Sequence, residues 1–407
     1  MSRSFPVLIV AIVAMLVQQT VATVAKTAVP VMFPAVALAL GIEPELVLVY
    51  TWLYACVGIL VMAGCGPFIL RFGAIRISQI GCLLMTFGMA LTAIGGSFWA
   101  GIAGLGFGCM LISIGSTSAT PASSQILARH SPPRVAPLVF SVKQSGVPAG
   151  IAISGGLVVP FAESIGWQGA SLAVGLLCAL IAVGLEPCRK GFDADRRPGQ
   201  KLALGDLRAT VYMVLHDPAL RIMALAAFAF VGLQSIFTNY TVVYLYEEVG
   251  YSAVEAGAIL SIGTLVAVPA RVLWGVVAST LVPSRPLLGA LAVVMSLGAA
   301  AMGAFTPEWS RFWVIAVCVV VSATGLSWHG VLLSEVARLA PDGEVARVTG
   351  GVLVFGTIGQ IVYPLLFGAA YAPLGYHAAY IAIALPAVGL AWAFFGGRRP
   401  KPPAKAG

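Results

Sequence analysis

The stretch ISQIGCLLMTFGMALTAIGGSFWAGIAGLGFGCMLISIGSTSATPASSQILA, residues 77–128, runs for 52 residues without a charged side chain. A membrane span needs about 20 apolar residues, so this run holds two helices, and Gly95-Gly96-Ser97 is the expected turn between them. Val348–Gly397 is a similar run of 50 residues if His377 is neutral, with its turn expected at Pro373-Leu374-Gly375. Continuous runs of this length exclude a membrane β-barrel, whose strands are short and alternating.

The composition of the whole chain agrees with these two runs. Apolar residues make up 59% and charged residues 9% of the sequence, whereas a soluble domain carries about 25% charged residues. The first run is expected to be a span rather than a cleaved signal peptide, because no clear small-residue cleavage site follows it. The total predicted is twelve transmembrane helices; the other uncharged runs are Phe5–Ala25, Leu46–Leu70, Ser164–Leu185, Ile222–Tyr246 and Pro286–Pro307.

One fixed offset of 209 residues relates the two halves of the chain. A repeat inside an apolar helical pattern predicts an all-α membrane protein, with two parallel six-helix halves around a central site. The expected parts are a first bundle over residues 1–188, a cytoplasmic linker over 189–217, a second bundle over 218–397 and a basic tail over 398–407. The pairs are Gly41/Gly250, Gly66/Gly275, Arg76/Arg285, Arg129/Arg338, Pro132/Pro341 and Gly166/Gly375.

The linker between the halves has its own signals. Arg189–His216 is the longest polar stretch, and Leu202–Leu215 is expected to form a short interfacial helix. Asp217-Pro218 is expected to be the N-cap and first residue of the seventh span, since both types are preferred at those positions.

Basic and acidic residues fall in alternate loops, which is the positive-inside pattern and places both termini in the cytoplasm. The net charge of +8 is therefore assigned to topology rather than to nucleic-acid binding. The acidic loops hold Glu43, Glu45, Glu163, Glu247, Glu248, Glu255 and Glu308, with Arg311 as their one basic residue. The basic loops hold Arg3, Arg71, Arg76, Arg129, Arg134, the Arg189–Arg221 segment, Arg285, Arg338, Arg347, Arg398, Arg399, Lys401 and Lys405.

The loop after the second span reads Gly66-Pro-Phe-Ile-Leu70-Arg71-Phe-Gly73-Ala-Ile-Arg76. It resembles the loop signature of the major facilitator superfamily, which has a glycine, an acidic residue with arginine, then a glycine and basic residues. Leu70 stands where that signature has its acid. The second half has a weaker copy, from Arg271 through Gly275 and Ser279 to Arg285. The loop arginines Arg71, Arg76 and Arg285 are expected to act in gating and to bind carbonyls at helix C-termini.

A second resemblance lies in the fifth span, which reads Ser141-Val-Lys143-Gln144-Ser-Gly146-Val-Pro148-Ala-Gly150. This stretch, together with the Gly325–Gly330 and Ala337-Arg338 segments, is similar to cyanate-permease-like and related organic-anion members of the superfamily. The resemblance implies a secondary active transporter with the twelve-helix fold.

Charged side chains at membrane depth are few, and they are functional candidates because burying them is costly. Lys26 lies on one helical face with Gln19, so both are expected to bind solute, with snorkelling of Lys26 as the alternative. Lys143 shares a face with Gly146 and Gly150, which favours a buried cavity over lipid; a structural bond to carbonyls is its alternative. Arg271 can hold a carboxylate bidentately or form a gate pair with Glu335.

Uncharged polar groups complete the candidate site. Gln234, Asn239, Tyr240 and Gln360 lie at membrane depth and could donate to a solute or bond a neighbouring helix. His329 and Glu335 are candidates for coupling or gating, since a histidine titrates near neutral pH; a neutral core histidine is the alternative. All seven cysteines are expected to be small apolar residues, without metal spacing.

These observations predict a secondary carrier for a small, carboxylate-like anion, working by alternating access with proton coupling or exchange. Three deep cations without a deep carboxylate give the pathway a positive bias. A multidrug or cation exporter of the same superfamily is the alternative, although residues 98–128 lack the arginine of that group. An enzyme is not expected, because neither HExxH nor GxSxG occurs.

The remaining expectations concern setting and partners. The chain should be a monomer in the bacterial inner membrane, spanning the bilayer many times. Its partners should be an anionic small molecule, the lipid and a proton, with no nucleic acid, metal or cofactor.

Overall fold

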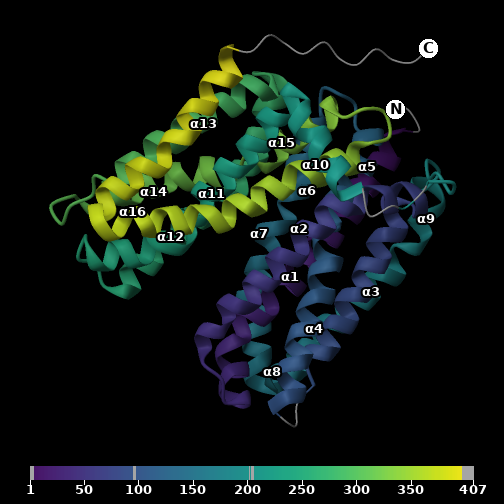
Figure 1. Ribbon diagram of the computed structural model, residues 1–407, viewed down its shortest axis with the longest axis horizontal. Helices are drawn as coiled ribbons and strands as arrows, with labels where there is room; N and C mark the ends of the chain where they lie inside the picture. Colours follow the sequence, from purple (N-terminus) through teal and green to yellow (C-terminus); the bar gives the residue numbers. More distant parts are fainter. Residues whose placement is uncertain (1–3, 95–97, 201, 203–205, 397–407) are drawn as a thin grey trace. The chain divides into compact units, whose positions relative to one another are not determined.

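The structure is a computed structural model that describes residues 4–94, 98–200, 202 and 206–396, and these residues form helices joined by short loops, without a strand (Figure 1). The first helices are α1 (Ser4–Leu40), η1 (Pro44–Leu46), α2 (Val47–Phe72), α3 (Ala74–Thr92), α4 (Phe98–Thr117), α5 (Ala119–His130), α6 (Ala136–Gln144), α7 (Gly146–Ile153), η2 (Ser154–Val158), α8 (Val159–Gly184) and α9 (Glu186–Phe192). The others are α10 (Asp206–His216), α11 (Pro218–Glu247), α12 (Ala253–Thr280), α13 (Ser284–Met302), α14 (Arg311–Gly325), α15 (His329–Leu339) and α16 (Val345–Gly396).

Ten helical segments in the described part are long and apolar enough to cross a membrane. Two of them, Ala136–Gly184 and Val345–Gly396, have 49 and 52 residues, more than twice the roughly 20 that one span needs. Each contains a glycine with non-helical backbone angles, Gly166 with φ 78° and Gly375 with φ 75°. The predicted turn at Pro373-Leu374-Gly375 therefore coincides with a break in α16, whereas the one at residues 95–97 lies outside the described residues.

Positive φ angles follow the 209-residue offset. Of the six glycines with positive φ among the described residues, four form two pairs, Gly41 with Gly250 and Gly166 with Gly375. A residue with a Cβ is disfavoured in this left-handed region, so the offset relates positions where the backbone requires glycine.

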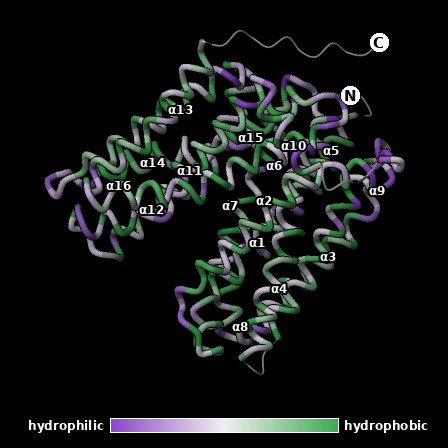
Figure 2. The backbone as a smooth tube through the Cα atoms, viewed as in Figure 1, coloured by the Kyte–Doolittle hydropathy of each residue, from purple (hydrophilic) through white to green (hydrophobic). Residues whose placement is uncertain are grey.

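The start of α11 and the helix in the linker agree largely with the predictions from the sequence. The Asp217 side chain accepts hydrogen bonds from Ala219 N and Leu220 N, with Pro218 as the first residue of α11, so the predicted cap is confirmed. The predicted linker helix over Leu202–Leu215 is found as α10, starting at Asp206 and ending at His216. Figure 2 shows hydrophilic residues gathered at helix ends, including the region of α9, while the long helices are mainly apolar.

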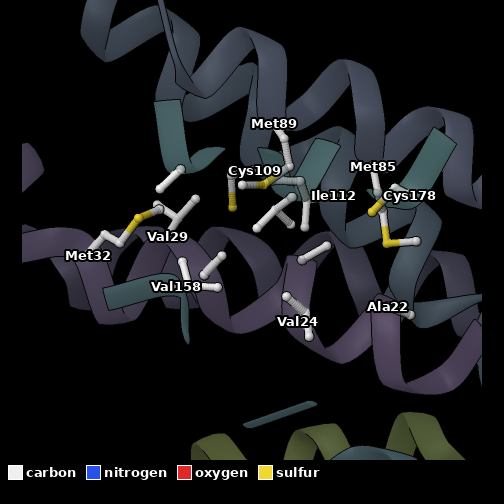
Figure 3. Packing of buried hydrophobic residues seen from close by; sticks show 14 of the residues in the cluster. Ala22, Val24, Val29, Met32, Met85, Met89, Cys109, Ile112, Val158 and Cys178 are labelled. Atoms are coloured by element: carbon white, nitrogen blue, oxygen red, sulfur yellow. The ribbon is translucent and has the colours of Figure 1, made fainter. Parts of the chain in front are cut away.

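The chain divides into two compact units. Unit 1 comprises Met1–Ser131, Lys143–Tyr212 and Ala340–Gly351. Its core is formed by buried side chains of α1, α3, α4 and α8, and Figure 3 shows Met85, Met89, Cys109 and Cys178 gathered at the α1 valines. Five of the seven cysteines are buried, Cys56 is exposed and Cys188 is half-buried.

Unit 2 comprises Pro132–Val142, Met213–Leu339 and Val352–Gly407. Aromatic side chains of α11, α16 and the α13–α14 loop form much of its core. The Tyr244 ring lies 5.0 Å from that of Tyr380, and the hydroxyl of Tyr244 donates to Met302 O at 2.7 Å. Phe367 stacks edge-on against Tyr380 in the same cluster.

Each unit includes a short segment from the other half of the sequence, and the two segments make equivalent contacts. A Cβ on Gly66 in unit 1 would lie 2.7 Å from the Arg347 Cα, and one on Gly275 in unit 2 would lie 3.0 Å from the Leu138 Cα. Gly275 follows Gly66 by 209 residues, and Arg347 follows Leu138 by the same 209. Glycine is thus required at both places because another helix backbone passes directly over it.

A hydrogen bond is repeated with the same offset. Ser113 Oγ donates to Tyr54 O at 2.7 Å in unit 1, and Ser322 Oγ donates to Gly263 O at 2.5 Å in unit 2. Cys109 and Cys318, one turn before each serine, are also separated by 209 residues.

Candidate functional site

Lys143 lies at the end of α6 and is 1% exposed. Its Nζ donates to Gln19 Oε1 at 2.6 Å and to Gln144 Oε1 at 3.0 Å. Gly146 and Gly150 let α7 approach α1 closely, since a Cβ on either glycine would crowd the α1 backbone at Leu16 and Thr20. The expected close approach of these two helices is confirmed.

The surroundings of the Lys143 ammonium are polar but uncharged. Thr120 of α5 also donates to Gln19 Oε1, at 3.1 Å, so one amide oxygen joins three helices. Lys143 forms no ion pair within the described residues. A buried cation held only by neutral oxygens is costly, and an anion arriving nearby would relieve that cost.

Lys26 has a different environment, because its side chain is exposed. Its Nζ lies 5.4 Å from the centre of the Tyr54 ring, a cation–π contact. The Tyr54 hydroxyl in turn lies 2.6 Å from Ser116 Oγ. On the face of α1 that carries Lys26, Gln19 and Thr23 are buried against neighbouring helices, whereas Lys26 is exposed and Pro30 is half-buried.

Arg271 of α12 is 4% exposed and donates from Nε to Leu326 O at 2.9 Å. Leu326 caps the end of α14, where the span Arg311–Leu339 is interrupted before α15. Ser327 Oγ donates to Ala267 O at 3.0 Å and Trp274 Nε1 donates to Ala323 O at 2.6 Å. Two side chains of α12 and one of the turn therefore join α12 to the end of α14.

The other polar candidates differ in access. Asn239 and Gln360 are exposed, and Tyr240 is half-buried. Gln234 lines a small, mainly apolar cavity in unit 2 that also includes Tyr380 and Gly325. Its Oε1 is buried without a hydrogen-bond partner in the part of the chain that the structure describes.

Glu335 and His329 occupy separate settings on α15. Glu335 is 5% exposed, and its two oxygens accept from Arg338 Nε at 2.9 Å and Nη2 at 2.6 Å. This bidentate pair occupies the carboxylate that a gate pair with Arg271 would need. His329 is half-buried and stacks on the Trp328 ring at 3.8 Å.

The three loop arginines are bound at helix ends. Arg285 Nη2 donates to Ala393 O in the last turn of α16 at 3.2 Å, which confirms the expected contact with helix carbonyls. Arg76 lies 3.9 Å from Glu186 Oε2, and the Arg71 guanidinium lies 5.5 Å from the Phe72 ring.

The structure therefore separates the predicted solute ligands into a reachable group and an enclosed group. Lys26, Asn239 and Gln360 are exposed, and polar groups at membrane depth usually face water rather than lipid. Lys143, Gln19 and Arg271 are enclosed and hydrogen-bonded. Sequence reasoning missed Tyr54, Ser116, Thr120 and Gln144; the repeated Ser113/Ser322 pair was the one sequence signal near them.

Comparison with solved structures supports the same architecture. The chain is similar to the fucose:proton symporter FucP of E. coli, with TM-score 0.75, 15% identity and coverage of 97% of this chain and 100% of that one. It is equally similar to the human organic anion transporter MFSD10, with TM-score 0.75, 15% identity and the same coverage. At these identities the likeness concerns the fold.

Two curated relatives come from Mycobacterium tuberculosis strain CDC 1551 / Oshkosh. A probable nitrate/nitrite transporter, NarK2, is 37% identical over 142 residues, 34% of this chain and 34% of the relative. An uncharacterised MFS-type transporter is 23% identical over 310 residues, 73% of this chain and 66% of the relative. The chain thus matches about a third of NarK2 and just under two thirds of the other relative.

The family model of the Major Facilitator Superfamily matches residues 8–335, well over half of the chain. Together with the many apolar spans, this match identifies a multi-pass membrane protein. The chain belongs to the Major Facilitator Superfamily.

Proposed function

We propose that the protein is a secondary active transporter that moves a small anion across the bacterial inner membrane by alternating access. The observation that carries the proposal is the set of cations at membrane depth. Lys26 and Lys143 form no ion pair among the described residues, and the enclosed Glu335 is already bound by Arg338. A pathway with this charge balance attracts anions and repels cations.

The substrate class follows from these donors and from the NarK2 likeness. A flat oxyanion such as nitrate or nitrite can accept hydrogen bonds from a guanidinium and an ammonium together. NarK2 is itself described as a probable nitrate/nitrite transporter. We therefore propose these two anions as the first candidates, before carboxylates and cyanate.

The proposed architecture has twelve crossings in two six-helix halves, with bundles over 1–188 and 218–397 and a linker over 189–217. Two double-length helical segments are broken at Gly166 and at Gly375. These breaks support the count of twelve, since each lets the chain turn and cross the membrane a second time. The repeated contacts at Gly66/Gly275 and Ser113/Ser322 support the 209-residue repeat. Both termini are proposed to be cytoplasmic, from the loop charges.

We assign initial solute contact to Lys26, Asn239 and Gln360, since these side chains are exposed. Lys143, Gln19, Arg271 and Gln234 would engage the anion as the pathway closes around it. Arg71, Arg76, Arg285 and the Glu335–Arg338 pair would act in gating. His329 would couple a proton, or the carrier would exchange one anion for another; a monomer suffices for either cycle.

Flux in proteoliposomes tests the proposal. Purified protein would be assayed with labelled nitrate, nitrite, cyanate, monocarboxylates and dicarboxylates, and beside them cationic dyes, with and without a pH gradient. Lys26→Gln removes the reachable charge at similar length, and Lys26→Arg keeps it. Anion flux that is lost in Lys26→Gln and kept in Lys26→Arg is the expected result.

Dye export without anion flux, unchanged by Lys26→Gln, would overturn the anion proposal in favour of a cation exporter. Acceleration of anion uptake by an inward proton gradient would support coupling, whereas acceleration only by anions loaded inside would support exchange.

A further inference from the structure

The loop between α2 and α3 has a carboxylate, although its own sequence has Leu70 where an acid is expected. The Asp193 side chain comes from the linker and accepts from Ile75 N at 2.7 Å and Arg76 N at 3.0 Å. These are amides of the first turn of α3, which has no side-chain cap of its own. A carboxylate at a helix N-terminus both satisfies these amides and complements the helix dipole.

The fit around Asp193 is close. Asp193 is 7% exposed, and Gly73 has φ 100°, so the backbone turns under the carboxylate. A Cβ on Gly73 would overlap the carboxyl group. Burial raises the pKa of Asp193, while its bonds to the Ile75 and Arg76 amides oppose that shift. The carboxyl is therefore enclosed by the loop rather than merely near it.

The same short stretch of linker binds two other elements of unit 1. Arg197 N donates to Leu70 O at 2.6 Å, near the end of α2 and just before the loop that leads to α3. Asp195 Oδ1 lies 3.3 Å from Arg129 Nη1, and Asp195 Oδ2 accepts from Gln125 Nε2 at 3.3 Å. The linker thereby joins the α2–α3 loop to the end of α5.

Gln125 extends this network to the start of α16. Its Oε1 accepts from Ala346 N at 3.1 Å and its Nε2 donates to Gly343 O at 3.4 Å. The Arg197 guanidinium also lies against Gly343, where a Cβ would overlap it. We call Gln125, Asp193, Asp195 and Arg197 the linker clamp; it holds the Ala340–Gly351 segment within unit 1.

Among the residues that the structure describes, none supplies an equivalent carboxylate to the matching loop of unit 2. Ser279 replaces the acid there, and its Oγ accepts from Leu138 N at 3.2 Å. Val282 stands 209 residues after Gly73, so the close backbone turn that admits Asp193 is not repeated. The clamp is therefore a feature of one unit.

We propose that Asp193 is a positioning residue for the transport cycle: it supplies from the linker the carboxylate that the α2–α3 loop lacks, and anchors a clamp that must release the start of α16 in every cycle. The proposal rests on the alternating access proposed above, since that cycle requires helix ends on one side of the membrane to part. Gln125 then exchanges its Ala346 and Gly343 partners for water when the segment leaves.

Cysteine labelling tests the clamp without any solute. Val345, the first residue of α16, is 9% exposed and similar in size to cysteine. Val345→Cys would be introduced with Cys56→Ser and Cys188→Ser, and labelled with a membrane-impermeant maleimide in inside-out vesicles. The variants compared are Asp193→Asn, which replaces one acceptor oxygen by an amide group, and Asp342→Asn, a charge-matched control at an exposed side chain that forms no ion pair among the described residues.

The expected result is a labelling rate raised about tenfold by Asp193→Asn and unchanged by Asp342→Asn. Asp195→Asn should raise the rate less, and the exchange Asp195→Arg with Arg129→Asp should restore it. In flux assays, with the rate expressed per folded molecule, Asp193→Asn should lower the maximal rate and leave the KM for the solute unchanged. A variant that was only less folded would show the wild-type rate per folded molecule.

Labelling unaffected by both Asp193→Asn and Asp195→Asn would overturn the proposal and reduce Asp193 to a local cap of α3. Because labelling requires no substrate, that outcome would leave the anion proposal standing. Conversely, absence of anion flux from the wild type, with the labelling pattern as expected, would reject the substrate class and retain the clamp.

Discussion

Units 1 and 2 repeat their packing contacts and some loop arginines, but not their charged residues at membrane depth. The bond from Ser113 Oγ to Tyr54 O recurs as that from Ser322 Oγ to Gly263 O. In contrast, the residues 209 positions from Lys26, Lys143 and Arg271 are Ser235, Val352 and Met62. Positions that carry close helix contacts are shared, and positions that carry charge at membrane depth are specific to one unit.

The difference extends to the groups around one cation. Lys26, Tyr54 and Ser116 form a polar chain in unit 1. Their counterparts after 209 residues are Ser235, Gly263 and Gly325, which are small. A symmetric scaffold can thus hold an asymmetric solute site, because side chains that project away from helix contacts are free to differ.

The largest expected effect comes from removing a charge that only unit 1 has. Lys143→Gln keeps a polar side chain but leaves Gln19 Oε1 without the ammonium. A hydrogen bond that involves a charged group contributes about 1.5–3 kcal/mol. We expect anion flux to fall about 100-fold, equivalent to about 2.7 kcal/mol, measured as initial rates in proteoliposomes.

Val352→Ala is the matched control at the repeat position. Val352 is fully buried and uncharged, so its truncation should lower the melting temperature while flux per folded molecule stays near that of the wild type. Equal flux losses in the two variants would show that the asymmetry of charge has no functional meaning.

The second effect concerns a contact that both units share. Gly66→Ala and Gly275→Ala each place a methyl group against the backbone of Arg347 or Leu138. Overpacking of this kind costs about 1–3 kcal/mol, so both variants should melt at lower temperature in detergent, by similar amounts.

Gly368 provides the control for the glycine variants. It lies inside α16, and a Cβ there would meet nothing within 4 Å. Gly368→Ala should therefore leave the melting temperature unchanged or raise it, since alanine favours a helix by about 1 kcal/mol. A strong effect in only one of Gly66→Ala and Gly275→Ala would break the equivalence of the two units.

A smaller effect is expected at the repeated serines. Ser113→Ala and Ser322→Ala each remove one hydrogen bond from a buried hydroxyl, and leave an acceptor carbonyl that also serves its own helix. A typical net contribution is about 1 kcal/mol. The losses in free energy of unfolding of the two variants should agree within about 0.5 kcal/mol. The double variant should show the sum of the two losses.

Features that depend on backbone geometry could be predicted from the sequence. Gly375 was expected at a turn and has φ 75°, Asp217 caps α11, and Arg285 binds the Ala393 carbonyl. Each of these follows from a local rule about glycine, helix caps or helix ends, or from the offset of 209 residues. The sequence also indicated that the α2–α3 loop lacks its own acid, because leucine occupies position 70, where the family signature has an acidic residue.

The partners of buried polar groups could not be predicted. Gln19 was placed on a water-facing stripe with Lys26, but it is turned toward Lys143, 124 residues away. Asp193 reaches Ile75 across 118 residues, and no periodicity links a linker carboxylate to a helix start. Such pairings are fixed by how helices pack in space, which a single sequence does not encode in its spacing.

The smallest effect expected is a pH dependence at a contact of unit 1 that has no repeat. Glu186 accepts from Gln79 Nε2 at 2.8 Å and from Arg189 Nη1 at 2.8 Å, and Phe395 stands at its repeat position. The Gln79 bond, followed by the charges of Arg189 and Arg76, lowers the pKa of Glu186 below 4.5.

Because the folded-state pKa of Glu186 lies below its unfolded value, its contribution to stability is present above pH 4.5 and disappears as the pH falls through the lowered pKa. The difference in melting temperature between the wild type and Glu186→Gln should thus shrink from about pH 7 to about pH 3. Glu163→Gln is the control, since Glu163 is exposed and has no ion pair among the described residues. An equal pH slope for both variants would mean that net charge, and not the Gln79 contact, sets the response. A slope confined to Glu186→Gln would identify the α3–α9 contact as a stabilising feature of unit 1 that unit 2 lacks.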